Sequence, residues 1–176
     1  PRIAIELPPS IDLQRIPGDA TLNGMLDSGE LDGMMSARAP SCLETNEKVV
    51  RLFPNYRADE ETYFAKTGLF PIMHLVAIRR SIVEQHPWLP VQVYRAYQEA
   101  KAICYEHLSE VGHLHTTLPW PVDEFARARE LMGNDFWRYG VAENAKEIEA
   151  MTRYAYEQGM TDRKLAAEEL FAPSVL

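Results

Sequence analysis

The feature that most constrains the fold is an apolar run over residues 69–78, which ends at Arg79 and Arg80. The run is nearly continuous, as in a strand that is covered on both faces, so we predict a buried strand over residues 70–80. It is well short of the ~20 apolar residues that a membrane helix needs. We therefore expect no membrane-spanning segment.

The start of the chain predicts alternating strands and helices. Residues 2–7 alternate in polarity and predict a short strand, and residues 31–37 predict a second, buried one. Between them, Asp19 is placed to cap a helix that ends at Gly29. Strand, helix, strand is the order of an α/β layer, whose ligands gather at the strand ends. We therefore predict an α/β fold class and look for ligand contacts at residues 36–41.

Most of the remaining chain predicts helices from apolar spacing and from capping residues. The predicted helices are a run from Asn46, residues 60–66 ended by Gly68, residues 82–86 capped by Ser81, residues 87–110, Asp123 to Gly133, residues 143–158 and a last helix from Thr161. The C-terminal half is thus expected to be helix-rich.

Charge and cysteine content limit the partners and the compartment. The chain has 18 Lys and Arg against 26 Asp and Glu, a net charge of -8, which gives no electrostatic reason to bind nucleic acid or an anionic membrane. Cys42 and Cys104 lie far apart without CxxC spacing, as expected for two free thiols in a reducing compartment. We expect a cytoplasmic protein with no nucleic-acid or membrane partner.

Four residues are candidates for a chemical role. His74 lies inside the apolar run, where an unpartnered imidazole would cost about 1–3 kcal/mol, so it is either a hydrogen-bonded core residue, which the strand alone favours, or it faces a cavity. Arg38 follows the predicted strand 31–37, where its guanidinium can meet a carboxylate, although a surface salt bridge is the simpler interpretation. His113 and His115 converge on a metal only with further ligands, so we predict no metal site.

An ordered set of short motifs resembles the 4,5-dihydroxyphthalate decarboxylase family over nearly the whole chain. Each motif is weak alone, whereas the set in this order is specific at the family level. The motifs are GELDG at 29–33, RLFP at 51–54, YF at 63–64, GLFPIMH at 68–74, HPW at 86–88, LPW at 118–120, WRYGV at 137–141, YEQG at 156–159 and ELFAPS at 169–174.

The resemblance implies a two-lobed, type II periplasmic-binding-protein-like fold with a ligand cleft where the chain crosses between lobes. On that basis residues 1–69 are part of the second α/β lobe, 70–80 are the crossover strand, and 81–176 are a C-terminal helical part that returns to the first lobe. A crossover strand borders the cleft, which favours a site role for His74.

The reaction that the resemblance implies is loss of one carboxylate from 4,5-dihydroxyphthalate or a related aromatic dicarboxylate, giving protocatechuate and CO2. Each carboxylate is para to a hydroxyl, whose ionisation raises electron density at the carbon that takes up a proton before CO2 leaves. Histidine is suited to deliver that proton and arginine to hold the other carboxylate. We therefore predict His74 as catalytic acid or base and Arg38, Ser41 and Tyr63 as substrate contacts, with no cofactor.

The alternative from another class is a solute-binding protein of an ABC-type transporter for an aromatic or other small carboxylate, which uses the same lobes without chemistry. The two short predicted strands leave the apolar run 69–78 partly uncovered. We expect further chain upstream of Pro1, which the resemblance favours, or pairing of copies in a homo-oligomer. A gene that starts near Pro1 would instead indicate a noncatalytic, truncated paralogue.

Overall fold

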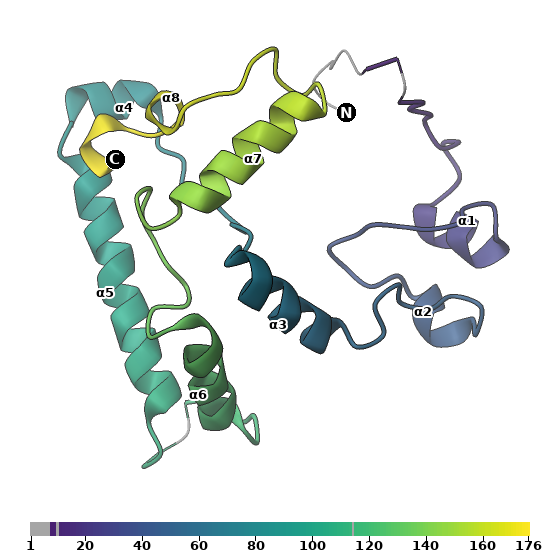
Figure 1. Cartoon of the computed structure of the whole chain (residues 1–176), viewed down its shortest axis with the longest axis horizontal. Helices are drawn as coiled ribbons and strands as arrows, with labels where there is room; N and C mark the ends of the chain where they lie inside the picture. The colour runs from purple at the N-terminus through teal and green to yellow at the C-terminus, as the bar shows by residue number, and fades with distance from the viewer. Residues whose placement is uncertain (1–7, 10, 114) are drawn as a thin grey trace. The chain divides into compact units, whose positions relative to one another are not determined.

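The computed structural model describes residues 8–9, 11–113 and 115–176, which form helices joined by loops (Figure 1). No strand occurs within these ranges. The helices are α1 (Leu22–Ser28), α2 (Cys42–Thr45), α3 (Tyr56–Thr67), α4 (Arg80–Gln85), α5 (Leu89–Ser109), α6 (Pro121–Met132), α7 (Ala145–Glu157), α8 (Ala167–Leu170) and the 3-10 helix η1 (Pro173–Val175). The chain divides into two compact units, Pro8–Glu60 and Glu61–Leu176, with the boundary inside α3.

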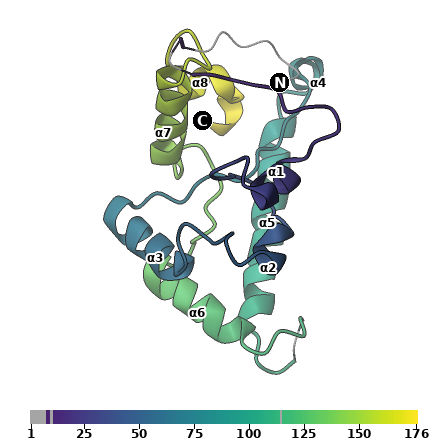
Figure 2. The same cartoon turned by 90° about the vertical axis from the view of Figure 1, so that its right-hand side faces the viewer.

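In the unit Pro8–Glu60, α1 packs against α2 (Figure 2). The side chain of Thr21 accepts a hydrogen bond from the Gly24 N–H at 3.0 Å and begins α1, and Gly29 ends the helix with φ 82°. Asn23 of α1 accepts hydrogen bonds at 3.2 Å from the Ser41 hydroxyl and from the Cys42 N–H. Local polar contacts of this kind, more than apolar burial, join the two helices.

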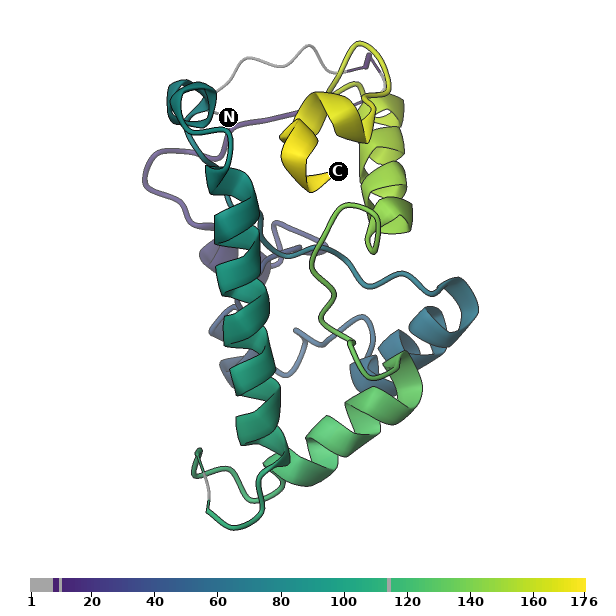
Figure 3. The ribbon, with the colours of Figure 1, turned by 90° about the vertical axis from the view of Figure 1, so that its left-hand side faces the viewer.

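In the unit Glu61–Leu176, the long helix α5 packs against α6 and η1, and α7 packs against α8 (Figure 3). Three rings form the contact between α5 and α6: Tyr105 lies 5.4 Å from Phe125 and stacks at 5.0 Å on Phe136. Burial raises the pKa of the Tyr105 hydroxyl, and the neighbouring Asp135 carboxylate adds to the rise, although the N–H that Trp137 donates to this oxygen opposes it.

The predicted strands are corrected by the structure. Residues 31–37 and 70–80 form no strand, and residues 2–7 lie outside the described residues, so the α/β class is not what the described chain shows. In residues 31–37, the Leu31 N–H bonds back to the Met25 carbonyl at the end of α1, and Met35 is 99% exposed. A strand needs a neighbouring strand for its backbone groups, and neither segment pairs with one among the described residues.

Several helices are confirmed and others are corrected. Helices α3, α5, α6 and α7 occur close to the predicted ranges. The predicted run from Asn46 is wrong, because Asn46 ends α2 and its side chain bonds to Asp27 and to the Lys48 N–H. Thr21 and not Asp19 caps α1. The last helix is confined to α8, since the Thr161 N–H bonds back to Ala155 at the end of α7.

The described residues contain neither a membrane-spanning helix nor a clustered metal site. None of their helices combines the length and the apolar character required to cross a membrane. Nor do these residues include a group of three or more histidine, cysteine, aspartate or glutamate side chains arranged to hold a metal ion.

The short helix α8 is held by a carboxylate that binds on both sides of the loop before it. Glu169 forms two hydrogen bonds with the Arg163 guanidinium, at 2.9 and 2.6 Å, and its Oε2 accepts the Ala166 N–H at 2.9 Å. The hydrogen bonds from Arg163 and then from Ala166 lower the pKa of Glu169 from its ordinary value of 4.5 to about 2.

We predict that Glu169 stabilises the fold above its ordinary pKa and that this contribution disappears as the pH falls from 4.5 to about 2. The depressed pKa means that the folded state prefers the ionised group, so acid removes the preference. Urea unfolding of the wild type and of Glu169→Gln, measured from pH 7 to pH 2, is expected to show a difference in midpoint that is full at pH 7 and gone at pH 2. Glu168→Gln, on the same helix, serves as the control. A difference that does not change with pH would contradict the assignment.

Candidate functional site

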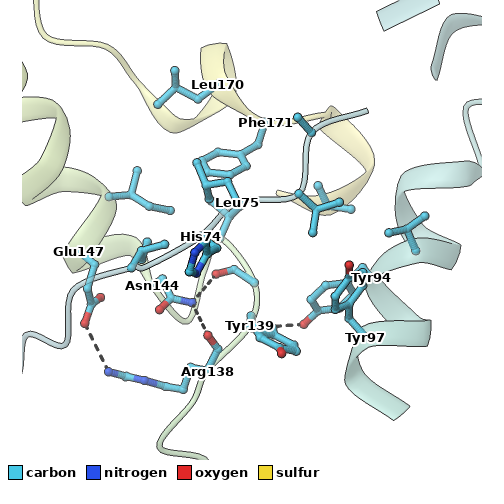
Figure 4. Close-up of a pocket in the computed structure, with 18 of the residues that line it drawn as sticks. His74, Leu75, Tyr94, Tyr97, Arg138, Tyr139, Asn144, Glu147, Leu170 and Phe171 are labelled. Atoms are coloured by element: carbon cyan, nitrogen blue, oxygen red, sulfur yellow. Dashed lines mark hydrogen bonds and ion pairs between the residues drawn. The ribbon is translucent and has the colours of Figure 1, made fainter. Parts of the chain in front are cut away.

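A pocket of about 760 Å³ lies within the unit Glu61–Leu176. Its wall comes from five parts of the chain: residues 70–78, Val83 of α4, helix α5, residues 136–148 and the C-terminal residues 170–175 (Figure 4). The volume falls in the range of roughly 300–1,000 Å³ that is usual for small-molecule sites. The pocket is therefore the candidate functional site.

The first wall is the apolar run that the sequence marks most strongly. Every residue from 70 to 78 lines the pocket. Met73, Leu75 and Val76 are more than half exposed, so the run contributes apolar surface to the pocket without being enclosed. His74 is the titratable residue of this wall and is also exposed.

The second wall is one face of α5, which presents phenol groups. Tyr94 donates a hydrogen bond at 3.4 Å to the Tyr139 carbonyl and accepts one at 2.7 Å from the Gln98 amide. The Tyr97 ring lies edge-on to the Tyr139 ring at 6.2 Å. These contacts give the pocket hydroxyl groups beside aromatic surface.

The third wall is the segment 135–141, whose backbone is fixed by side chains from two helices. The carbonyls of Arg138 and Gly140 accept hydrogen bonds from the Asn144 amide at 3.1 and 2.8 Å, and the Tyr139 carbonyl accepts the bond from Tyr94. Three successive carbonyls are thus held in place. Side chains on this segment are positioned by fixed backbone and not by a loose loop.

A second set of contacts holds the beginning of the same segment on α5. The Lys101 ammonium forms an ion pair with Asp135 at 2.7 Å, donates to the Trp137 carbonyl at 3.2 Å and lies 4.7 Å from the centre of the Tyr139 ring. The Tyr105 hydroxyl accepts the Trp137 N–H at 3.0 Å. Trp137 is therefore fixed, and its ring meets Phe70 edge-on at 5.3 Å.

Charge enters the pocket through Glu147 and Arg138. The Glu147 side chain is only 4% exposed, and its Oε1 accepts the Phe70 N–H at 3.3 Å and lies 3.5 Å from Nη2 of Arg138. A buried carboxylate needs such partners, because an unpaired charge is costly away from water. In the view of Figure 4, His74 lies in the middle of the drawn residues, with this pair on one side and Tyr94 and Tyr97 on the other.

These groups together suit a small aromatic acid. Trp137, Phe70 and Phe171 offer ring surface, Tyr94 and Tyr97 offer hydroxyls, and Arg138 offers a positive charge. An imidazole is present to exchange a proton. The carboxylate that lines the pocket, Glu147, contacts the Phe70 N–H and Arg138.

The structure places the predicted catalytic residue at the pocket. His74 lines this pocket, whereas the strand predicted around it is wrong. Its function as acid or base stays a prediction.

The three predicted substrate contacts lie elsewhere. Arg38 and Ser41 belong to the unit Pro8–Glu60, where both are exposed and Ser41 bonds to Asn23. Tyr63 lies on α3 and is not among the residues that line the pocket. None of the three is among the residues that line the pocket, and their contacts with substrate stay predictions.

Sequence reasoning missed Arg138, Glu147, Asn144 and Tyr94. The signal that marks α5 is a stripe of polar and aromatic residues at helical spacing: Tyr94, Tyr97, Gln98, Lys101 and Tyr105. No local signal marks the bond between Glu147 and Phe70, because the two residues are 77 positions apart.

Three histidines gather at the C-terminal end of α5. His115 stacks on His107 at 3.8 Å and lies 4.5 Å from His113. Loss of hydration lowers the pKa of His115, and the charges of His107 and His113 lower it further. None of the three lines the pocket.

The chain is homologous to 4,5-dihydroxyphthalate decarboxylase from Comamonas testosteroni, with 36% identity over 176 residues and 99% of this chain. A shorter stretch of 41 residues, 23% of the chain, is 46% identical to 4,5-dihydroxyphthalate decarboxylase from Pseudomonas putida. No family model matches the chain. The resemblance that the motifs indicate is therefore confirmed as homology.

The share of each related protein that the match covers differs between the two. The chain spans about half of the Comamonas protein, 53% of its length, and the aligned stretch covers 16% of the Pseudomonas protein. The homology identifies the kind of protein to which this chain is related.

We predict that Gly140→Ala disturbs the pocket more than the matched change Gly133→Ala. Both glycines have positive φ, 112° and 91°, so a side chain strains either backbone by about 1–3 kcal/mol. At Gly133 an added Cβ meets nothing within 4 Å, whereas at Gly140 it approaches the Tyr94 hydroxyl to 3.2 Å and the Glu143 carboxylate.

Trp137 fluorescence and thermal unfolding of the two variants separate backbone strain from displacement at the pocket. Both variants are expected to lower the unfolding midpoint, and only Gly140→Ala is expected to shift the emission of Trp137. Identical spectra with identical midpoints would show that the segment 135–141 is not fixed as described.

Proposed function

We propose that this protein acts in the decarboxylation of 4,5-dihydroxyphthalate or a related aromatic dicarboxylate, giving protocatechuate and CO2. The homology to a decarboxylase over 99% of the chain is the observation that carries the proposal. The pocket supports it independently, because its walls combine aromatic surface, phenol hydroxyls, a guanidinium and an imidazole.

The ring of the substrate is proposed to lie against the apolar and aromatic walls. Residues 70–78 supply apolar surface on one side, and Trp137 is held against Phe70 on another. Burial of an aromatic ring contributes roughly 25 cal/mol per Å² of apolar surface removed from water. Ring contact therefore supplies affinity, and polar groups set the orientation.

His74 is proposed to handle the proton. Ionisation of the para hydroxyl pushes electron density onto the ring carbon that bears the departing carboxylate, and a proton adds there to form a C–H bond. The C–C bond then breaks, its electron pair restores the aromatic ring, and CO2 leaves. An imidazole at the pocket is suited to donate the proton or to accept the phenolic one. No redox partner is needed for this balance.

The test compares His74→Gln with His86→Gln in the protein expressed from its complete gene. His86 serves as a matched control because it lies against Trp88 and does not line the pocket. General acid–base catalysis contributes typically ~10²–10⁴-fold, so kcat of His74→Gln is expected to fall by about that factor while KM changes little. His86→Gln is expected to retain wild-type kinetics.

Release of CO2 and formation of protocatechuate from 4,5-dihydroxyphthalate are the measurements. Wild-type activity in His74→Gln would remove His74 from the mechanism. Tight binding of an aromatic acid by the wild type without any turnover would reject the enzyme and favour a solute-binding protein.

A further inference from the structure

We propose that Arg138 binds a carboxylate of the ligand in the pocket, while the buried Glu147 holds its guanidinium at the pocket wall. This inference rests on the proposed function for the kind of ligand, an aromatic acid. It moves the site of carboxylate recognition from Arg38, in the other unit, to the pocket that contains His74.

The first argument is charge. Of the residues that line the pocket in the described part of the chain, Arg138 is the sole lysine or arginine. The other nearby cation, Lys101, has a side chain that is 9% exposed and is committed to Asp135 at 2.7 Å. A carboxylate that enters the pocket therefore meets one permanent positive charge, on Arg138.

The second argument is unused bonding capacity. The guanidinium has five N–H donors, and its ion pair with Glu147 joins one nitrogen to one oxygen at 3.5 Å. Among the described residues, no group forms a hydrogen bond with this guanidinium. Charge-assisted contacts are usually about 2.7–2.9 Å long, so Glu147 orients the guanidinium without using up its donors. A two-point contact with a second carboxylate remains available.

The third argument is preorganisation. Asn144 and Tyr94 fix the carbonyls of residues 138, 139 and 140, and Glu147 is itself fixed by the Phe70 N–H. The Arg138 side chain is 38% exposed, so it is reachable from the pocket although its position is set. Fixing a binding group in advance removes part of the entropy cost of binding.

The chemical class of the ligand follows from the neighbours of Arg138. Trp137 precedes it and Tyr139 follows it, and both residues line the pocket. A flat acid can place its carboxylate on the guanidinium and its ring on these aromatic groups. The matched pair of probes is thus 3,4-dihydroxybenzoate, which has a carboxylate, and catechol, which has the same ring and hydroxyls without it.

The experiment measures the dissociation constants of both probes by Trp137 fluorescence and calorimetry in the protein expressed from its complete gene. Arg138→Gln is expected to weaken binding of 3,4-dihydroxybenzoate by at least about tenfold and to leave catechol within about twofold, since tenfold corresponds to ~1.4 kcal/mol, less than one charged hydrogen bond often contributes. Arg138→Lys keeps the charge but loses the planar fork, so an intermediate loss is expected.

Arg153→Gln is the matched control, because it removes the same charge from the surface of α7, where Arg153 pairs with Glu149 and Glu157. It is expected to bind both probes as the wild type does. Thermal unfolding checks that each variant is folded. If Arg138→Gln does not fold, Arg138→Lys provides the test, because it retains a cation beside Glu147.

The inference is overturned if the wild type binds the two probes equally. It is also overturned if folded Arg138→Gln or Arg138→Lys binds both probes as the wild type does, or loses affinity for both. A third contrary result is that Arg153→Gln weakens binding of 3,4-dihydroxybenzoate as much as Arg138→Gln does. Turnover of 4,5-dihydroxyphthalate is measured separately. Absence of turnover together with acid binding that depends on Arg138 would reject the proposed function and keep this inference. Turnover and acid binding that are both unchanged in Arg138→Gln would reject this inference and keep the proposed function.

Discussion

The buried carboxylate of Glu147 is the interaction on which the pocket depends. It accepts the backbone N–H of Phe70 and pairs with Arg138, so one side chain of α7 joins the beginning of the apolar run to the segment 135–141. Only 4% of this side chain is exposed, so hydration by water does little to stabilise its charge. The Phe70 N–H and Arg138 therefore stabilise the buried carboxylate, and the carboxylate in turn holds both of them in place. A pocket wall that is built in this way keeps its charged group in place before a ligand arrives.

Helix α5 provides the complementary support from the other side. Tyr94, Lys101 and Tyr105 lie about one and two helical turns apart on the same face, and each contacts the segment 135–141. Lys101 pairs closely with Asp135 of this segment, at 2.7 Å. Arg138 of the same segment has only the longer pair with Glu147, at 3.5 Å. The closer ion pair thus lies where the helix packs, and the longer one lies at the pocket, where an acid is proposed to share Arg138 with Glu147.

Local signals predicted the helices better than any other feature. Apolar spacing and the glycines that follow each helix indicated α1, α3 and α6 from a few neighbouring residues. The strands failed because a strand is defined by distant partners, which residues 31–37 and 70–80 do not have among the described residues. His74 was found from its apolar neighbours. Arg138 was not, because its importance arises from Glu147 and through it from Phe70, which is 77 positions from Glu147.

The failure of the strand prediction at residues 70–80 and the presence of a pocket beside the same residues have one physical cause. An apolar run of this kind has to be covered, whether by neighbouring strands or by other side chains. Here the run borders a cavity whose opposite walls come from α5, the segment 135–141 and the C-terminal residues. Met73, Leu75 and Val76 keep more than half of their surface exposed there. Covering apolar surface of this kind with a flat ring is favourable, and the proposed contact of Arg138 with a carboxylate would favour a ring that carries one. The sequence pattern that suggested a buried strand is therefore also the pattern expected for one wall of an aromatic-acid site.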